Sequence, residues 1–175
     1  SLVRPETKLV VCTAASNVFG IMPPVSKIGE MCKKHGILFA VDAAQAAGVY
    51  PIDIKKSNID FLAIAGHKGL YAPMGTGVLI LNGTLPDTLI EGGTGTFSEK
   101  IEQPEILPEM FESGTLNVPG IAGISAGADF IKSKGIGNIY GHEMRIIRII
   151  HNEFKDNERI LLYSDPTGPL PYCPV

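Results

Sequence analysis

Cysteine is scarce in this sequence of 175 residues, which contains three: Cys12, Cys32 and Cys173. An odd number without regular spacing argues against a disulfide framework and is typical of a reducing compartment. We therefore expect a cytoplasmic protein. Cys12 lies in an apolar run that suggests a strand and Cys32 in a helical pattern, so both are interpreted as inert core thiols.

Excess charge is also missing. The formal net charge of −3 and the isoelectric point near 5.8 give no electrostatic reason to bind nucleic acid or an anionic membrane. Residues 69–86 carry no charge, but this stretch contains Pro73, Gly75 and Gly77, so it reads as a buried strand with turns rather than a membrane span. The first eight residues lack the apolar core of a signal peptide. We expect neither a nucleic-acid partner nor a membrane partner.

Several functional motifs are absent as well. The four histidines are scattered and lack ligand spacing with the cysteines, so we expect no metal site. There is no Ser-His-Asp arrangement, no glycine-rich dinucleotide fingerprint and no internal repeat. What is present is a hydrophobic share of 45% and a charged share of 19%, which fit a globular protein with a core.

Short apolar runs alternate with amphipathic segments along the chain. The pattern predicts strands at 8–13, 37–41, 59–64 and 76–81, and helices at 23–35, 120–133 and 136–156. We expect the strand at 76–81 to be antiparallel or at an edge, residues 91–108 to form a long loop, and residues 159–164 to begin a further strand. The order strand, helix, strand predicts an α/β fold with a mostly parallel sheet and flanking helices.

Two of the apolar runs end on residues that can carry chemistry. Asp42 follows the run at 37–41, and Gly66-His67-Lys68 follows the run at 59–64. The carboxyl ends of parallel strands face one cleft, so an acid and an amine can meet there. Pyridoxal phosphate requires this pair, a lysine for its Schiff base and an acid that keeps its ring nitrogen protonated. A turn or helix starting at Asp42 would point Gln45 into the same pocket, where it would donate to the phenolic oxygen of the cofactor.

Other roles for these residues stay open at this point. Asp42 is suited to capping a helix or turn, and Lys68 is equally compatible with an exposed loop lysine. His67 is compatible with a residue that caps its own turn, and Asn17 with an ordinary turn asparagine.

Six segments of the chain resemble the class V aminotransferase group, whose best-known members are cysteine desulfurases and selenocysteine lyases. They follow the order of the family: Ala15-Ser16-Asn17-Val18, Val41-Asp42-Ala43-Ala44-Gln45, Gly66-His67-Lys68-Gly69-Leu70-Tyr71, Gly75-Thr76-Gly77, Gly92-Gly93-Thr94-Gly95 and Glu112-Ser113-Gly114-Thr115-Leu116-Asn117.

The resemblance implies a pyridoxal-phosphate-dependent transferase of the aspartate-aminotransferase-like fold. Members of the family are considerably longer, so residues 1–135 would be the C-terminal half of the cofactor-binding large domain and residues 136–175 the start of a truncated small domain. The implied catalytic residues are Lys68, which binds the cofactor and moves the α-proton of the substrate, and His67, near phosphate or substrate. The implied cofactor-binding residues are Asp42, Gln45, Asn17, Lys68, His67 and Thr94.

The matching family threonine reaches across a dimer interface to the neighbouring cofactor, so Thr94 implies a homodimer with shared sites. Two departures concern the site: Ala65 stands where the family commonly has serine or threonine, and Ala14 where it commonly has histidine. Without the hydroxyl at Ala65, phosphate binding would rest on His67, on backbone amides or on residues outside this chain.

The function implied by the resemblance is that of a fragment of an enzyme that releases sulfur or selenium from an amino acid such as cysteine, with a sulfur-acceptor protein as a partner. The nucleophilic cysteine of that chemistry would lie outside this chain, and we expect the isolated chain to be inactive. One alternative is a class V aminotransferase that acts on another small amino acid. Another is a non-catalytic α/β homologue.

Overall fold

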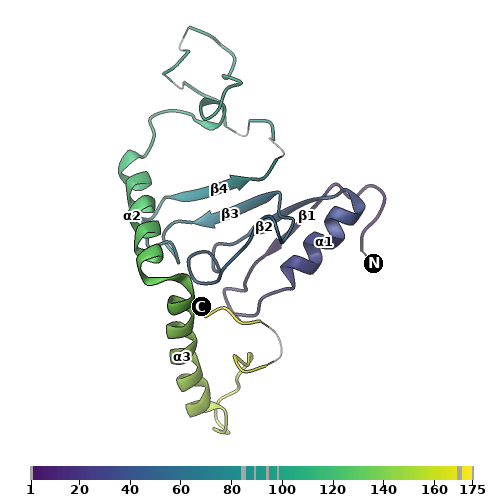
Figure 1. The fold of residues 1–175 in the computed structure, drawn as a ribbon, viewed down its shortest axis with the longest axis vertical. Helices are drawn as coiled ribbons and strands as arrows, with labels where there is room; N and C mark the ends of the chain where they lie inside the picture. The colour runs from purple at the N-terminus through teal and green to yellow at the C-terminus, as the bar shows by residue number, and fades with distance from the viewer. Residues whose placement is uncertain are drawn as a thin grey trace.

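A four-stranded sheet forms the centre of the molecule in the computed structural model, which describes residues 2–83, 86–88, 90–93, 95–97, 99–168 and 171–174. The strands β1 (Leu9–Thr13), β2 (Leu38–Asp42), β3 (Phe61–Ala65) and β4 (Gly77–Leu81) lie in this order across the sheet. β1, β2 and β3 are parallel, and β4 pairs antiparallel with β3 at the edge (Figure 1). The predicted α/β class, the mostly parallel sheet and the antiparallel edge strand are confirmed.

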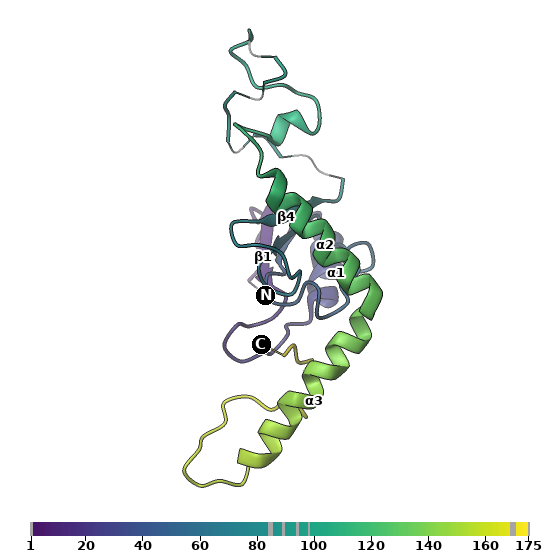
Figure 2. The ribbon, with the colours of Figure 1, turned by 90° about the vertical axis from the view of Figure 1, so that its left-hand side faces the viewer.

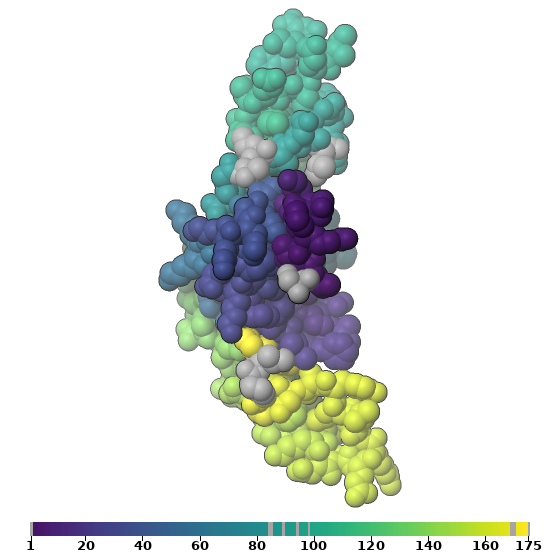
Figure 3. Space-filling view, turned by 90° about the vertical axis from the view of Figure 1, so that its right-hand side faces the viewer, coloured from purple at the N-terminus to yellow at the C-terminus, as the bar shows by residue number. Residues whose placement is uncertain are grey.

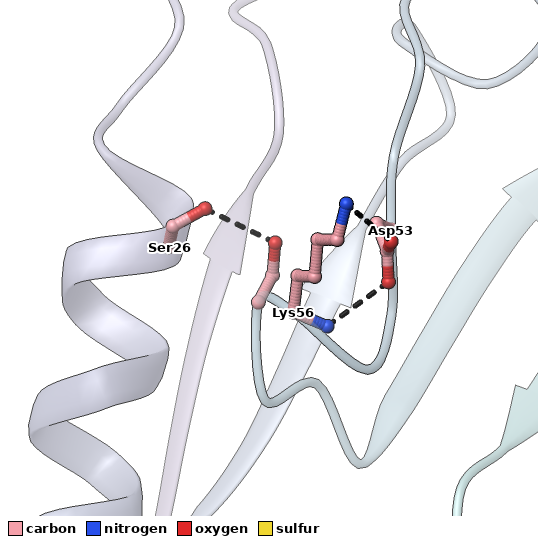
Figure 4. Close-up of polar contacts among 4 residues, drawn as sticks. Ser26, Asp53 and Lys56 are labelled. Atoms are coloured by element: carbon pink, nitrogen blue, oxygen red, sulfur yellow. Dashed lines mark hydrogen bonds and ion pairs between the residues drawn. The ribbon is translucent and has the colours of Figure 1, made fainter.

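The helix α1 (Val25–His35) connects β1 to β2 and covers one face of the sheet. Its C-terminus is closed by Gly36 in the left-handed conformation (φ 65°), as predicted. At its start, the hydroxyls of Ser26 and Ser57 share a hydrogen bond of 3.1 Å (Figure 4). The loop that carries Ser57 is closed by an ion pair between Lys56 and Asp53 (3.7 Å), so α1 is tied to the segment that leads into β3.

The two faces of the sheet differ in cover. Phe39 and Val41 of β2 are buried on the side of α1, where they form the core together with Leu62 and Cys32. On the opposite face Val11 is 64% exposed and Leu79 is 53% exposed. This second face is therefore open to solvent in the described chain.

Two helices follow the long excursion that begins after β4. A short 3₁₀ helix, η1 (Glu109–Phe111), precedes α2 (Val118–Lys134), and α3 (Ile136–Phe154) follows directly. Figure 2 shows α2 beside the sheet and α3 extending beyond it. The sequence predicts one apolar face along α3, but only its first half packs: Ile139 is buried, whereas Ile150 is 50% exposed.

The prediction of a strand at 159–164 is wrong. This segment forms turns and irregular backbone, and Leu161 is 72% exposed. Its residues have high β-propensity, but a strand needs a neighbouring edge with which to pair. The chain instead returns to the N-terminal half further on, where Ile21 and Tyr172 form an isolated antiparallel bridge. Figure 3 shows atoms of the C-terminal segment, in yellow, against the blue and purple N-terminal half.

Candidate active site

The candidate site lies where the three parallel strands end. The β1–β2–β3 register places Thr13, Asp42 and Ala63 in one row. Beyond this row the ladder continues, since the Ala14 N–H donates to the Asp42 carbonyl (2.7 Å) and the Ala43 N–H donates to the Ala63 carbonyl (2.8 Å). The three connections that carry Asn17, Gln45 and Lys68 therefore begin side by side, as the parallel topology predicts.

The turn that carries Gln45 and the turn that carries Lys68 touch through their backbones. A Cβ atom on Gly48 would overlap the carbonyl oxygen of Gly69, and a Cβ atom on Gly69 would overlap the carbonyl oxygen of Ala47. Gly48 also has a φ of 83°, a conformation that glycine adopts without steric cost. Only glycine at both positions permits this approach, and it fixes the distance between the two turns.

Gln45 and Lys68 line the same open cavity, whose volume is about 380 Å³. On the far side of this cavity lies α3, which contributes Glu143, and burial raises the pKa of the Glu143 carboxyl. The cavity thus combines an amine, an amide and a carboxyl on a largely apolar wall. The other lining residues are Val49, Gly69, Tyr71, Ile146, Ile147 and Pro174.

Asp42 is an exposed residue on the open face of the sheet, and it does not line the cavity of Gln45 and Lys68. One carboxylate oxygen, Oδ1, accepts a hydrogen bond from the Ala44 N–H at 2.9 Å. This is the capping role that the sequence left open. Within the described chain the other oxygen, Oδ2, has no hydrogen-bond partner, so the cap does not exclude a second role for Asp42.

The turn of His67 and Lys68 is held from the side of β4. The Gly66 N–H donates to the Thr76 carbonyl (2.9 Å), and the Ala72 N–H donates to the Gly66 carbonyl (2.9 Å). Tyr71 closes the turn with its N–H on the Lys68 carbonyl (2.9 Å) and has a φ of 55°. A non-glycine residue in this left-handed region is uncommon and persists only where its surroundings impose it.

The helix α2 holds the same turn from a second side through three glycines spaced by three and four residues, the spacing of one helical face. Cβ atoms on Gly120, Gly123 and Gly127 would overlap Thr76, Pro73 and the carbonyl oxygen of Leu70, respectively. The sequence pattern predicts a helix at 120–133, but it does not indicate this glycine face. Its start is set by Asn117, whose Oδ1 accepts the Gly120 N–H at 3.0 Å.

The remaining predicted site residues are less constrained. Asn17 and His67 are exposed, and neither lines the cavity of Gln45 and Lys68. In the Asn17 loop, Ser16 provides the local order, because its Oγ accepts from the N–H groups of Val18 and Phe19 (3.3 and 3.2 Å). Thr94 lies outside the described residues.

The described residues contain neither a membrane-spanning helix nor a metal-binding cluster. None of its helices combines the length and the apolar character needed to cross a membrane. No group of three or more histidine, cysteine, aspartate or glutamate side chains lies close enough together to hold a metal ion in the part of the chain that the structure describes.

Comparison with known proteins gives a consistent result. The chain is 40% identical over 149 residues to a probable cysteine desulfurase of Pyrococcus abyssi, which covers 81% of this chain and 36% of the relative. It is 36% identical over 169 residues to a probable cysteine desulfurase of Methanothermobacter thermautotrophicus, covering 94% of this chain and 42% of the relative.

Among solved structures, the apo cysteine desulfurase of Thermococcus onnurineus NA1 superimposes with a TM-score of 0.70 at 33% identity, covering 85% of this chain and 38% of that one. This likeness confirms the predicted fold of pyridoxal-phosphate-dependent transferases. The chain spans less than half the length of the curated relatives it matches. A sequence profile of the family described as Aminotransferase class-V matches residues 1–171, and the chain therefore belongs to the class V aminotransferase family.

Proposed function

We propose that this chain forms one wall of the cofactor site of a pyridoxal-phosphate enzyme that releases sulfur or selenium from an amino acid such as cysteine. The observation that carries the proposal is the backbone contact between Gly48 and Gly69. It holds a lysine and an amide donor at one cavity, next to the strand that ends in Asp42. The names of the relatives, which are cysteine desulfurases, support the choice of substrate class.

The donor set fits this cofactor. Lys68 supplies an amine on a turn that is fixed by β4 and α2, and Asp42 supplies a carboxylate oxygen that its cap leaves without a partner. Gln45 supplies an amide that can donate to a phenolic oxygen. Ala65 provides no hydroxyl for a phosphate, so this anion would rest on His67 and on backbone N–H groups.

Bound pyridoxal phosphate supplies the electron sink that makes the α-proton of an amino acid acidic. In this proposal Lys68 would hold the cofactor through its Nζ, and the same amine, when free, would accept the α-proton of the substrate. Asp42 would hold a proton at the ring nitrogen, and Gln45 would orient the ring. The rigid turns contribute by keeping these three groups in fixed relative positions.

Several parts of the proposal concern a protein of the relatives' length. Residues 1–135 would belong to its large domain and residues 136–175 to its small domain. A homodimer with shared sites through Thr94, a cytoplasmic location and a sulfur-acceptor protein as partner belong to the same proposal.

Cofactor attachment tests the proposal on the chain itself. The chain is mixed with millimolar pyridoxal phosphate, reduced with borohydride and digested, and the labelled lysines are identified by mass spectrometry. We expect label on Lys68 in preference to exposed lysines such as Lys56, and its loss in Lys68→Arg. Equal labelling of all exposed lysines would refute the assignment. Sulfide release from cysteine is measured on a protein of the relatives' length that carries this sequence, with Lys68→Ala as the control.

A further inference from the structure

The segment 171–174, which we call the C-terminal strap, pairs with the loop that carries Asn17. The Met22 N–H donates to the Pro171 carbonyl (3.0 Å), and the Cys173 N–H donates to the Gly20 carbonyl (2.8 Å). These two bonds flank the bridge between Ile21 and Tyr172. The strap therefore extends the Asn17 loop by a short antiparallel ladder, although about 150 residues separate the two segments.

The strap also contacts the turn that carries Gln45. Cys173 is fully buried in the main core, and its Sγ lies 3.7 Å from the Gln45 carbonyl oxygen. The Tyr140 hydroxyl of α3 donates to the Tyr172 carbonyl (2.9 Å), while the Tyr140 ring packs edge-on against Tyr50 (5.6 Å between centroids), just after the Gln45 turn. Loop, turn and α3 thus meet at the strap.

Close packing leaves the strap little freedom at Gly20. A Cβ atom there would lie 2.5 Å from Cζ of the Tyr172 ring and 2.6 Å from the Cys173 carbonyl oxygen. Gly20 also has a φ of 67°. Gly36 has nearly the same φ, 65°, but open space around a Cβ atom, so it provides a matched comparison.

We propose that the C-terminal strap is a positioning element that holds the Asn17 loop and the Gln45 turn in place for the site. This inference rests on the proposed function for its role toward a cofactor, but the docking of the strap is independent of it. The loop's internal order comes mainly from Ser16 and does not connect it to the Gln45 turn. The strap supplies that connection, through Gly20 on one side and the Gln45 carbonyl on the other.

The thiol of Cys173 reports whether the strap is docked. Burial raises the pKa of Cys173 to about 11, so in the folded chain it reacts with iodoacetamide only when the strap opens. We expect Cys173 to react far more slowly in the native chain than in the urea-unfolded chain. Tyr140→Phe removes one hydrogen bond and should accelerate the reaction about two- to tenfold, whereas Tyr163→Phe, at an exposed tyrosine, should not.

Gly20→Ala should accelerate the reaction of Cys173 by more than about tenfold. The new Cβ atom would overlap Tyr172 and the Cys173 carbonyl, and the positive φ would strain the backbone as well. Gly36→Ala carries the backbone strain alone and should change it less than about twofold. A native Cys173 that reacts as fast as in the unfolded chain would overturn the proposal, and so would equal effects of the two glycine variants.

The positioning role is read from hydrogen exchange. Cys173→Lys places a charge at a fully buried position and should undock the strap, whereas Leu161→Lys alters an exposed residue. We expect faster amide exchange at residues 16–22 and 44–50 in Cys173→Lys only, with α1 unchanged. Exchange that stays at the wild-type rate in both segments after the strap has undocked would show that the strap holds nothing in place.

A third measurement, cofactor attachment to Lys68, separates this inference from the proposed function. Borohydride labelling of Lys68 should fall at least about tenfold in Cys173→Lys, the loss expected when a preformed site must be reordered on binding, and should be unchanged in Leu161→Lys. Undiminished labelling in Cys173→Lys would limit the strap to a structural role and overturn its role toward the site. If the wild-type chain shows no preference for Lys68, the proposed function fails, while the thiol and exchange measurements still decide whether the strap positions the two segments.

Discussion

The contact between α2 and the Lys68 turn predicts opposite effects of one substitution at two helical glycines. In Gly127→Ala the new Cβ atom would overlap the backbone carbonyl oxygen of Leu70, which cannot rotate away. Overpacking of this kind costs about 1–3 kcal/mol, and the better helix propensity of alanine returns up to about 1 kcal/mol. We expect a net loss of about 1–2 kcal/mol in the free energy of unfolding. Gly141 of α3 has no atom within 4 Å of such a Cβ, so Gly141→Ala should stabilise the chain by about 0.5–1 kcal/mol.

Urea unfolding followed by circular dichroism measures both effects. With an m-value of about 1–3 kcal/mol/M, the two variants should differ in midpoint by about 1 M. Gly127→Ala should also reduce borohydride labelling of Lys68, because α2 and the turn must separate, whereas Gly141→Ala should leave the labelling unchanged. A Gly127→Ala variant as stable as the wild type would show that α2 does not pack on Leu70 as described.

Three further predictions follow. Asp42→Asn keeps the oxygen that accepts from the Ala44 N–H but loses the negative charge. In a protein of the relatives' length, the substrate α-proton should therefore be removed more slowly by orders of magnitude, while cofactor binding weakens less. Unchanged turnover would refute the role of Asp42. Asn117→Ala should cost about 1 kcal/mol because α2 loses its cap, measured by thermal unfolding against exposed Asn152→Ala, and equal melting temperatures would contradict the cap. Burial raises the pKa of Cys173 from 9.0 to about 11, so as the pH rises the thiol ionises in the unfolded chain before it ionises in the folded chain. The contribution of Cys173 to the free energy of unfolding should therefore be constant below pH 9 and fall by about 2–3 kcal/mol between pH 9 and 11. In Cys173→Ala this part of the pH dependence of stability should be lost, and an unaltered pH dependence would contradict the burial of the thiol.

Much of the fold could be predicted because burial leaves a pattern in the sequence. The apolar runs before Asp42 and Gly66 are strands, and Gly36 ends α1 as a glycine C-cap should. The same reasoning failed at 159–164, since β-propensity records what a residue tolerates and not whether a sheet edge is near. In this chain Tyr172 forms an isolated bridge instead, with Ile21 in the loop after β1, a contact that no local pattern indicates.

In the candidate site, too, some features could be predicted from the sequence and others could not. Strand ends predicted that Asp42 and Lys68 come from neighbouring connections, since parallel topology alone brings them to one edge. The contact of Gly48 with Gly69 and the glycine face of α2 were not predicted, because hydrophobic periodicity detects buried side chains and not the approach of two backbones. Glu143 was missed for another reason: it reaches the cavity from α3, whose direction depends on the turn at Gly135 and not on its own sequence.

The exposure of Asp42 determines how much its charge can contribute. Two unit charges 4 Å apart interact by about 1 kcal/mol in water but by about 4 kcal/mol at an effective dielectric constant near 20. Asp42 lies on the face of the sheet that the described chain leaves open, next to exposed Ala63. While this face is open to water, the attraction between Asp42 and a protonated ring nitrogen would therefore be small. The difference between the two environments, about 3 kcal/mol, corresponds to about two units in the pKa of that nitrogen. The lysine and the amide are positioned by contacts within the chain, whereas the electrostatic strength of Asp42 depends on whatever excludes water from the open face.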